Sequence, residues 1–198
     1  MTFDLLRGLA LFAFVTSITP GPNNIMLMAS GVNFGLRRTV PHMVGIFFGF
    51  ISMIALIGLG VSAVFDARPW LDEALKVAAL AYMVWLAWRV AHAAAPAQDQ
   101  TGEASPLSAF QAAAFQWVNP KGWAMALGAN AAYAPTHELR DVLIVTAVFG
   151  VINLPAAGCW AVIGTQLTRL LQNPKWLRLF NWSMALFLLI SLIPVLAG

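Results

Sequence analysis

Long stretches without a charged residue divide this chain into segments that match the thickness of a membrane. A helix that rises 1.5 Å per residue needs about 20 apolar residues to cross about 30 Å of hydrocarbon. Four stretches reach this length and lack Asp, Glu, Lys and Arg: Gly8–Leu36, Thr39–Phe65, Val142–Thr168 and Leu179–Gly198. Each of them predicts a transmembrane helix.

Two further segments are apolar but less regular. Val77–Trp88 lies between Lys76 and Arg89, so a span here needs flanking residues, and the two basic side chains must reach the interface. Ser105–Ala134 is apolar except where Asn119-Pro120-Lys121 interrupts it. With these two segments the pattern predicts six transmembrane helices.

Clusters of proline, glycine and asparagine interrupt the first and the fourth predicted span. Thr19-Pro20-Gly21-Pro22-Asn23-Asn24 lies in the middle of the first, and Asn119-Pro120-Lys121-Gly122 lies in the fourth. Proline removes a backbone donor and clashes with the preceding turn, so no continuous helix is expected through either cluster. Such breaks are tolerated at membrane depth where they face protein or a water-filled cavity. The alternative is that the prolines only kink two helices, since proline is common in membrane spans.

The two clusters lie half a chain apart. Pro20 and Pro120 are separated by 120 − 20 = 100 positions, and half of the 198 residues is 99. Each half then holds three spans, and because three is odd the halves face opposite ways in the membrane. Interrupted spans at matching positions of two halves point to a transporter binding site. We therefore predict an all-α polytopic membrane protein with one transporter domain, 1–198. Its six transmembrane helices form two inverted three-helix repeats, about 1–95 and about 106–198, joined by a loop at 96–105, and the first helix of each repeat is broken.

Composition excludes most other classes of protein. Hydrophobic residues make up 60% of the chain and charged residues 10%, against roughly 45–50% and roughly 25% in globular domains; the mean hydropathy is +0.77. Six spans of about 20 residues use nearly all of the apolar residues, so no soluble catalytic domain fits. Cys159 is the single cysteine, and the chain lacks zinc-binding and phosphate-binding motifs, so neither a metal nor a cofactor is expected. The net charge of +3 is scattered along the chain and does not indicate nucleic-acid binding.

The distribution of basic residues predicts an orientation. The loops after the first, third and fifth spans carry six of them: Arg37, Arg38, Arg89, Arg169, Lys175 and Arg178. The opposite side carries four: Arg7, Arg68, Lys76 and Arg140. The positive-inside rule therefore places the first set in the cytoplasm and both termini on the outer side, although a bias of six to four is modest.

The predicted breaks bring a specific set of polar groups to the middle of the membrane. The half-helices that begin near Asn23 and Pro120 expose free N–H groups and positive dipole ends, and Lys121 adds a full positive charge, so a carboxylate is the natural ligand. Asparagine amides and broken-helix carbonyls can receive an amino group. The predicted substrate-binding residues are Thr19, Pro20, Gly21, Pro22, Asn23, Asn24, Asn119, Pro120, Lys121 and Asn153. The alternatives are a lysine that snorkels to the interface and asparagines that only bridge helices.

Three other features of the spans carry expectations. Gly45-x-x-x-Gly49 predicts the close approach of another helix. Asn153-Leu154-Pro155 is expected to break or bend the fifth span and to act as a hinge. His42 lies just inside the second span and titrates near neutral pH in its unperturbed state, although a satisfied polar helix end is the simpler interpretation.

The paired motifs resemble those of a known transporter family. Thr19-Pro20-Gly21-Pro22-Asn23 and Asn119-Pro120-Lys121 are similar to the two signature motifs of the lysine-exporter/homoserine–threonine-resistance (LysE/RhtB) family, and Tyr82–Arg89 resembles its third span. The resemblance covers essentially the whole chain. It implies a multi-pass protein of the bacterial inner membrane, a secondary transporter that exports amino acids by alternating access, driven by the proton gradient. Within the family, the chain looks most similar to the cysteine/O-acetylserine exporter branch.

The spans also bear on the substrate. Members that export basic amino acids carry, by resemblance, an acidic residue near the position of Phe50, and no predicted span of this chain contains Asp or Glu. A buried basic side chain would lack a counter-charge, so small neutral substrates fit better. The same absence leaves proton coupling open, with Lys121 and His42 as candidates and a substrate gradient as the alternative driving force.

The expected partners are an amino acid, membrane lipid and protons, with no nucleic acid; a homodimer stays open. The other readings are an exporter of basic amino acids or of another small ion, and an accessory subunit; an enzyme would need a catalytic cluster that the sequence lacks.

Overall fold

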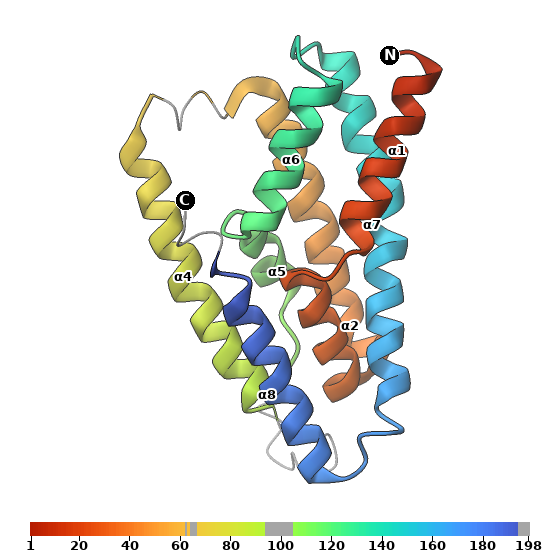
Figure 1. Cartoon of the computed structure of the whole chain (residues 1–198), viewed down its shortest axis with the longest axis vertical. Coiled ribbons are helices and arrows are strands. Elements are labelled where there is room, and N and C mark those ends of the chain that lie inside the picture. The colour runs from red at the N-terminus through yellow and green to blue at the C-terminus, as the bar shows by residue number, and fades with distance from the viewer. Residues whose placement is uncertain (62, 64–66, 94–104, 194–198) are drawn as a thin grey trace.

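The computed structural model describes residues 1–61, 63, 67–93 and 105–193, and within these ranges it is entirely helical (Figure 1). Its elements are α1 (Phe3–Ile18), α2 (Pro22–Leu56) with a π-helical continuation (Ile57–Val61), α4 (Pro69–Ala91), α5 (Ala109–Gln116), α6 (Pro120–Tyr133), α7 (Leu139–Leu167) and α8 (Pro174–Ile190). The expected loop at 96–105 and the end of the sixth span, 194–198, lie almost wholly outside the described residues.

Three helical segments in the described part of the chain are long and apolar enough to cross a membrane: Pro22–Val61, Glu73–Ala91 and Leu139–Leu167. The first and fourth expected spans are each divided in two, and their pieces α1, α5 and α6 have 16, 8 and 14 residues. Pieces of this length are too short to span about 30 Å alone. The breaks that the prolines predicted are therefore confirmed as interruptions of helix.

Proline marks the beginning of most of these helices. Pro22, Pro69, Pro120 and Pro174 stand in the first turn of α2, α4, α6 and α8. A first-turn proline loses no intrahelical hydrogen bond, and its fixed φ suits the helix. Inside α7 the outcome differs from the expectation, because the helix continues through Pro155 without non-helical backbone angles. α7 is one continuous helix, so the chain does not break at Asn153-Leu154-Pro155, while a bend and a hinge there stay predictions.

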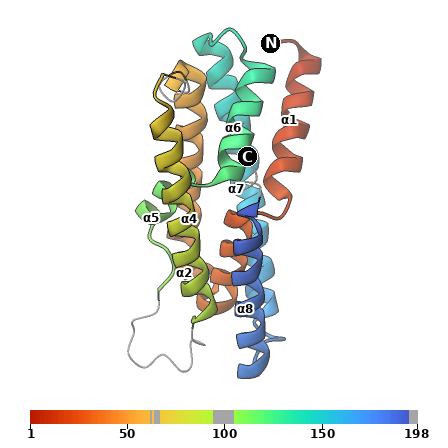
Figure 2. The same cartoon turned by 60° about the vertical axis from the view of Figure 1, so that its left-hand side comes forward.

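The second half of α2 turns back beside the first half without an intervening loop. Gly35 has φ 76° and ψ 166°, a conformation that glycine adopts readily because it lacks a Cβ. Across the bend, the hydroxyl oxygens of Ser30 and Thr39 lie 2.8 Å apart. Nine residues of straight helix would separate those two positions by about 13 Å, so the chain reverses here (Figures 1 and 2).

Small residues let the central helices approach one another closely. A Cβ on Gly164 of α7 would lie 2.9 Å from the carbonyl carbon of Met28 on α2. A Cβ on Gly49 would lie 2.6 Å from the Cα of Ala113 on α5, and one on Gly45 would meet the backbone of Ala109. The close approach expected at Gly45-x-x-x-Gly49 is thus confirmed. It brings the short helix α5 against the second half of α2.

Two apolar clusters fill the interior. The lower one, in the orientation of Figure 1, joins α2, α4, α5 and α8 through residues such as Ile46, Met83 and Phe115. The upper one joins α1, α2, α6 and α7 around Phe50 and Phe149, whose rings meet edge to face with centroids 5.7 Å apart. Many large apolar side chains also cover the outside, among them Leu11, Phe110, Leu143, Val151 and Trp176. An exterior of this kind suits contact with lipid.

A methyl group added at the α2–α7 crossing should destabilise the protein. We expect Gly164→Ala to lower the free energy of unfolding by about 1–3 kcal/mol, because the packed backbones must separate. The matched control is Gly128→Ala on α6, where the nearest atom to the new methyl is Phe12 Cζ at 3.7 Å. That change should be neutral or stabilising by about 0.5–1 kcal/mol. Thermal unfolding of purified protein in detergent checks both, and equal melting temperatures would contradict the packing argument.

Candidate functional site

The first break is an extended segment between two helices. α1 ends at Ile18, Thr19 and Gly21 have extended backbone angles, and α2 begins at Pro22. Because two prolines fall within three positions, the helix cannot continue, and the last carbonyl groups of α1 lose their intrahelical donors. In a membrane these carbonyls need other partners.

Side chains from three helices supply those partners. Asn24 Nδ2 donates to the carbonyl oxygens of Ser17 and Thr19, both at 2.8 Å. Trp160 Nε1 on α7 donates to the carbonyl of Ile18 at 3.1 Å, and the Thr19 hydroxyl donates to that of Thr16 at 3.1 Å. The remaining donor is Lys121 on α6. The end of α1 is therefore capped from outside itself.

Lys121 binds the same stretch with its ammonium group. Nζ lies 2.7 Å from the Thr19 carbonyl oxygen, 3.0 Å from the Thr19 hydroxyl and 3.4 Å from the Pro20 carbonyl oxygen. Three oxygens match the three N–H donors of an ammonium. A positive charge at a helix C-terminus is also favourable electrostatically. Gly21 leaves room for this side chain, since a Cβ there would lie 2.6 Å from Lys121 Cδ.

The second break is closed largely by its own backbone. α5 ends at Gln116 and α6 begins at Pro120. Trp117, Val118 and Asn119 donate their N–H groups to carbonyls three residues earlier, at 3.1–3.2 Å. The indole of Trp123 donates to the Trp117 carbonyl at 2.8 Å. This break therefore resembles a tight turn, whereas the first depends on distant residues.

A reciprocal pair of amides joins the two breaks. Asn23 Nδ2 donates to Gln116 Oε1 at 2.8 Å, and Gln116 Nε2 donates to Asn23 Oδ1 at 3.1 Å. The two residues are 93 positions apart, and Gln116 is fully buried. Gln116 is not among the site residues that were predicted from the sequence. The signal that could have indicated it is an amide side chain at the end of an apolar run, directly before a break.

A small cavity lies between the breaks, with a volume of about 20 Å³. It is lined by Thr16, Ser17, Gly21, Asn23, Asn24, Phe50, Asn119, Lys121, Gly122, Met125 and Asn153. Six of these were predicted as site residues from the sequence, and the structure brings them together. Thr19, Pro20, Pro22 and Pro120 form the adjoining backbone without lining the cavity. The volume is close to the minimum that admits one water molecule, so this conformation is closed around the breaks.

Two amide oxygens beside the cavity have no hydrogen-bond partner among the described residues. They are Oδ1 of Asn119 and Oδ1 of Asn153, which are 2% and 9% exposed. Asn153 Nδ2 lies 3.5 Å from the Ser17 hydroxyl. Asn24, in contrast, uses its amide to cap α1, and Asn130 donates to the carbonyls of Ile54 and Ala126. Oδ1 of Asn130 is also unpaired, but Asn130 does not line the cavity, so the free amide acceptors beside the cavity are those of Asn119 and Asn153.

The first turns of α2 and α6 both border this cavity. Gly21, Asn23 and Asn24 belong to the start of α2, and Asn119, Lys121 and Gly122 to the start of α6. The N-terminus of a helix carries unpaired N–H groups and a partial positive charge. Among the residues that the structure describes, no Asp or Glu lines the cavity. The site is therefore suited to an anionic group at the helix starts and to a donor at the asparagine oxygens.

Comparison with known proteins identifies the family of this chain. The sequence pattern of the "LysE type translocator" family matches residues 14–192. The chain belongs to the LysE family of translocators. It is 32% identical over 177 residues to the cysteine/O-acetylserine efflux proteins of Escherichia coli (strain K12) and of Shigella flexneri. The match covers 87% of this chain and 89% of each relative. No solved structure matches this member of the LysE family.

The capping of α1 should matter for stability. We expect Asn24→Leu to lower the free energy of unfolding by about 1–3 kcal/mol, because the buried Ser17 carbonyl then lacks a donor. The control is Gln166→Leu on α7, where the side chain is exposed. Thermal unfolding in detergent measures both variants. A melting temperature for Asn24→Leu that equals that of the control would show that the α1 end needs no side-chain cap.

Proposed function

We propose that this LysE-family chain exports small neutral amino acids from the cytoplasm across the bacterial inner membrane. The observation that carries the proposal is the meeting of two helix starts, the Lys121 ammonium and two unpaired asparagine oxygens around one cavity. A zwitterion has complementary groups. Its carboxylate suits the helix starts and Lys121, and its ammonium suits Oδ1 of Asn119 and Asn153.

The arrangement of helices supports an inverted repeat of six spans. α1 packs on α7 and α5 packs on the second half of α2, as equivalent elements of two repeats would do, while α4 packs on α8. The second half-helices both begin with proline, at Pro22 and Pro120, and so do the last helices, at Pro69 and Pro174. Rocking of one repeat against the other would open the closed cavity to either side.

Binding requires Lys121 to exchange partners. In the closed conformation its ammonium is held by oxygens of Thr19 and Pro20. A substrate carboxylate competes with these carbonyls, and once Lys121 moves, Asn24 still caps the Thr19 carbonyl. Loading of substrate and release of Lys121 from Thr19 and Pro20 are then one event. This links occupancy of the site to movement of the half-helices.

The substrate class follows from the charges around the cavity. Its described lining residues include Lys121 and no carboxylate, and Phe50 forms an apolar wall. A lysine or arginine side chain would find no counter-charge there and would face a like charge. The relatives' names, cysteine and O-acetylserine efflux, agree with a small neutral amino acid.

Proton coupling and orientation complete the proposal. The bend of α2 lies on the lower face in Figure 1, and Arg37 and Arg38 follow it directly in the sequence. By the positive-inside rule, this face would lie in the cytoplasm. The titratable side chains that line cavities of the described chain are Lys121 in the central one, His42, Arg89 and His92 in one beside the bend of α2, and Lys175 and Arg178 in one at the start of α8. Export driven by protons would use a group of this set, and an imposed pH gradient across proteoliposomes tests for it.

Replacement of Lys121 should sharply reduce transport and leave the fold intact. We expect Lys121→Met to reduce counterflow of labelled substrate in proteoliposomes by about 10–100-fold, since a charge-assisted contact to the carboxylate is worth about 1.5–3 kcal/mol. The control is Lys175→Met, an exposed lysine in the first turn of α8. Counterflow by Lys121→Met at the rate of the control, in protein with an unchanged melting temperature, would remove Lys121 from the site.

A substrate panel tests the class of cargo. Proteoliposomes loaded in turn with unlabelled neutral, basic and acidic amino acids should exchange labelled O-acetylserine only for small neutral ones. Exchange of lysine or arginine would overturn the argument from the absent carboxylate. The absence of any exchange by folded protein would favour an accessory subunit or an ion exporter instead.

A further inference from the structure

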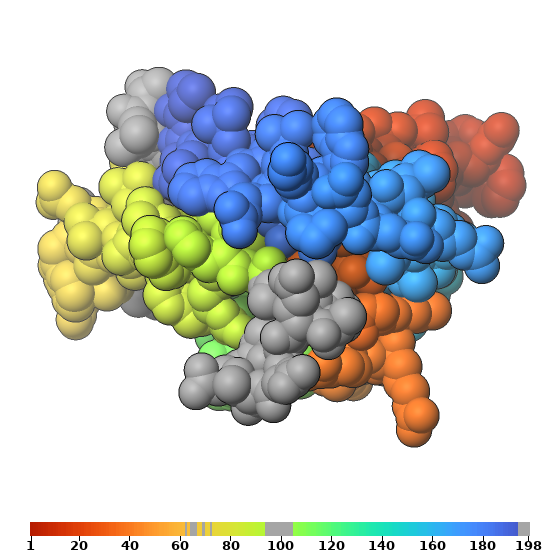
Figure 3. All heavy atoms as spheres, turned by 90° about the horizontal axis from the view of Figure 1, so that it is seen from below, coloured from red at the N-terminus to blue at the C-terminus, as the bar shows by residue number. Residues whose placement is uncertain are grey.

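A second and larger cavity lies at the lower end of the molecule. Its volume is about 320 Å³, within the range of small-molecule sites. Its walls come from the bend of α2, the last turns of α4 and the residues that lead into α5. Figure 3, seen from below, shows the bend of α2 (orange) and the end of α4 (yellow-green) on this face. The central cavity between the breaks does not share its lining residues.

His42 is the first polar feature of this lower cavity. Its side chain is 1% exposed, and neither ring nitrogen has a hydrogen-bond partner among the described residues. Leaving a buried polar group unpaired is costly. Ser30 and Asn33 also line the cavity, but Ser30 pairs with Thr39 and Asn33 pairs with Asn181. His42 is therefore the buried polar side chain of this lining that is left for a ligand.

Arg89 is the second feature. One N–H group, on Nη2, donates to the Ser105 carbonyl at 2.8 Å, and the guanidinium lies 5.0 Å from the ring centroid of Trp85. No described carboxylate pairs with it. A guanidinium has five N–H donors in a planar fork that fits a carboxylate. His92 is the other titratable side chain of this lining, and one of its ring nitrogens lies 2.9 Å from the Trp88 carbonyl oxygen.

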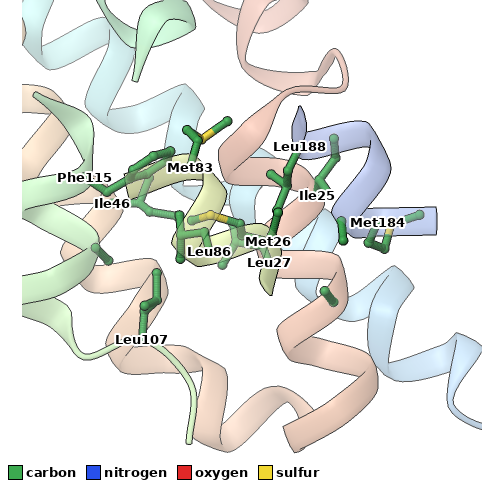
Figure 4. Close-up of a cluster of buried hydrophobic side chains, with 14 of the residues drawn as sticks. Ile25, Met26, Leu27, Ile46, Met83, Leu86, Leu107, Phe115, Met184 and Leu188 are labelled. Carbon is green, nitrogen blue, oxygen red and sulfur yellow. The ribbon is translucent and has the colours of Figure 1, made fainter. Parts of the chain in front are cut away.

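Part of the cavity wall is apolar. Met26, Leu86 and Leu107 line it and also belong to the lower apolar cluster (Figure 4). The same cluster contains Ile25 and Phe115, next to Asn24 and Gln116 of the central site. The apolar cluster thus lies between the two cavities. A ligand in the lower cavity would be held outside this barrier.

We propose that the lower cavity is a separate access site, which binds the zwitterionic amino acid before it reaches the breaks. Arg89 binds the carboxylate, His42 provides a hydrogen bond inside the apolar pocket, and the cluster around Met26 and Leu86 closes the way inward. This proposal rests on the proposed function, because it takes the ligand to be the exported amino acid. It assigns the first contact on the cytoplasmic side to residues outside the two broken segments.

Protection of an introduced thiol from labelling tests the access site directly. In a Cys159→Ser background, which removes the single native cysteine, Val90→Cys places a reporter on the cavity wall. The probe is O-acetyl-L-serine at slightly acidic pH, and 2-aminoethyl acetate is the same molecule without the carboxylate. At about ten times its dissociation constant, the probe should slow maleimide labelling by about tenfold. The analogue should not. The positional control is Gln172→Cys, an exposed site between α7 and α8, where labelling should be unchanged.

Two further variants separate this proposal from the proposed function. Protection of Val90→Cys should persist with Lys121→Met, which removes the central site, and should be lost with Arg89→Gln but retained in part with Arg89→Lys. Protection that disappears with Lys121→Met, or that is absent from the start, would overturn the access site. A protein that protects the thiol yet fails to exchange amino acids would overturn the proposed function and keep the site.

Discussion

The carbonyl groups at the end of α1 impose the constraint on which the centre of this protein depends. A helix that stops inside a membrane leaves acceptors that water does not reach. Here Asn24, Trp160 and Lys121 donate to them from α2, α7 and α6. Three helices are therefore positioned by the same few oxygens. The break is not a local irregularity but the point where the two halves of the chain hold each other.

The two breaks contain similar residue types, but their backbone groups are satisfied in different ways. After Gln116 three successive turn hydrogen bonds satisfy much of the backbone, and the nearby Trp123 indole bonds the Trp117 carbonyl. After Ile18 the carbonyl groups accept hydrogen bonds from side chains of other helices, and one of these donors is the flexible Lys121. A charged ligand can replace that lysine's partners without unfolding the turn opposite. Of the two breaks around the cavity, the one after Ile18 can therefore respond to a ligand, while the one after Gln116 keeps its hydrogen bonds.

The two cavities differ in size and polarity, which fits different roles in recognition of the substrate. The central cavity is small, polar and bordered by helix starts, while the lower one is larger, mostly apolar and contains an arginine without a described carboxylate partner. The apolar cluster between them contains Met26 and Leu86, unbranched or flexible side chains that can move aside more readily than β-branched ones. Neither cavity contains a described carboxylate in its lining, which favours the same neutral zwitterion in both.

Residue types alone predicted the breaks at Pro20 and Pro120, the polar residues that lie at them and the lack of acidic residues in the spans. Proline removes a donor and glycine adds freedom wherever they stand, so Pro20, Pro22 and Pro120 could be interpreted without a structure. The tertiary structure alone decided the partners. Nothing local indicates that Gln116 meets Asn23, that Trp160 reaches Ile18 across 142 positions, or that α2 reverses at Gly35. It also decided that α7 continues through Pro155. Backbone chemistry is local and can be predicted from residue type, whereas hydrogen-bond pairing between spans depends on how the helices pack.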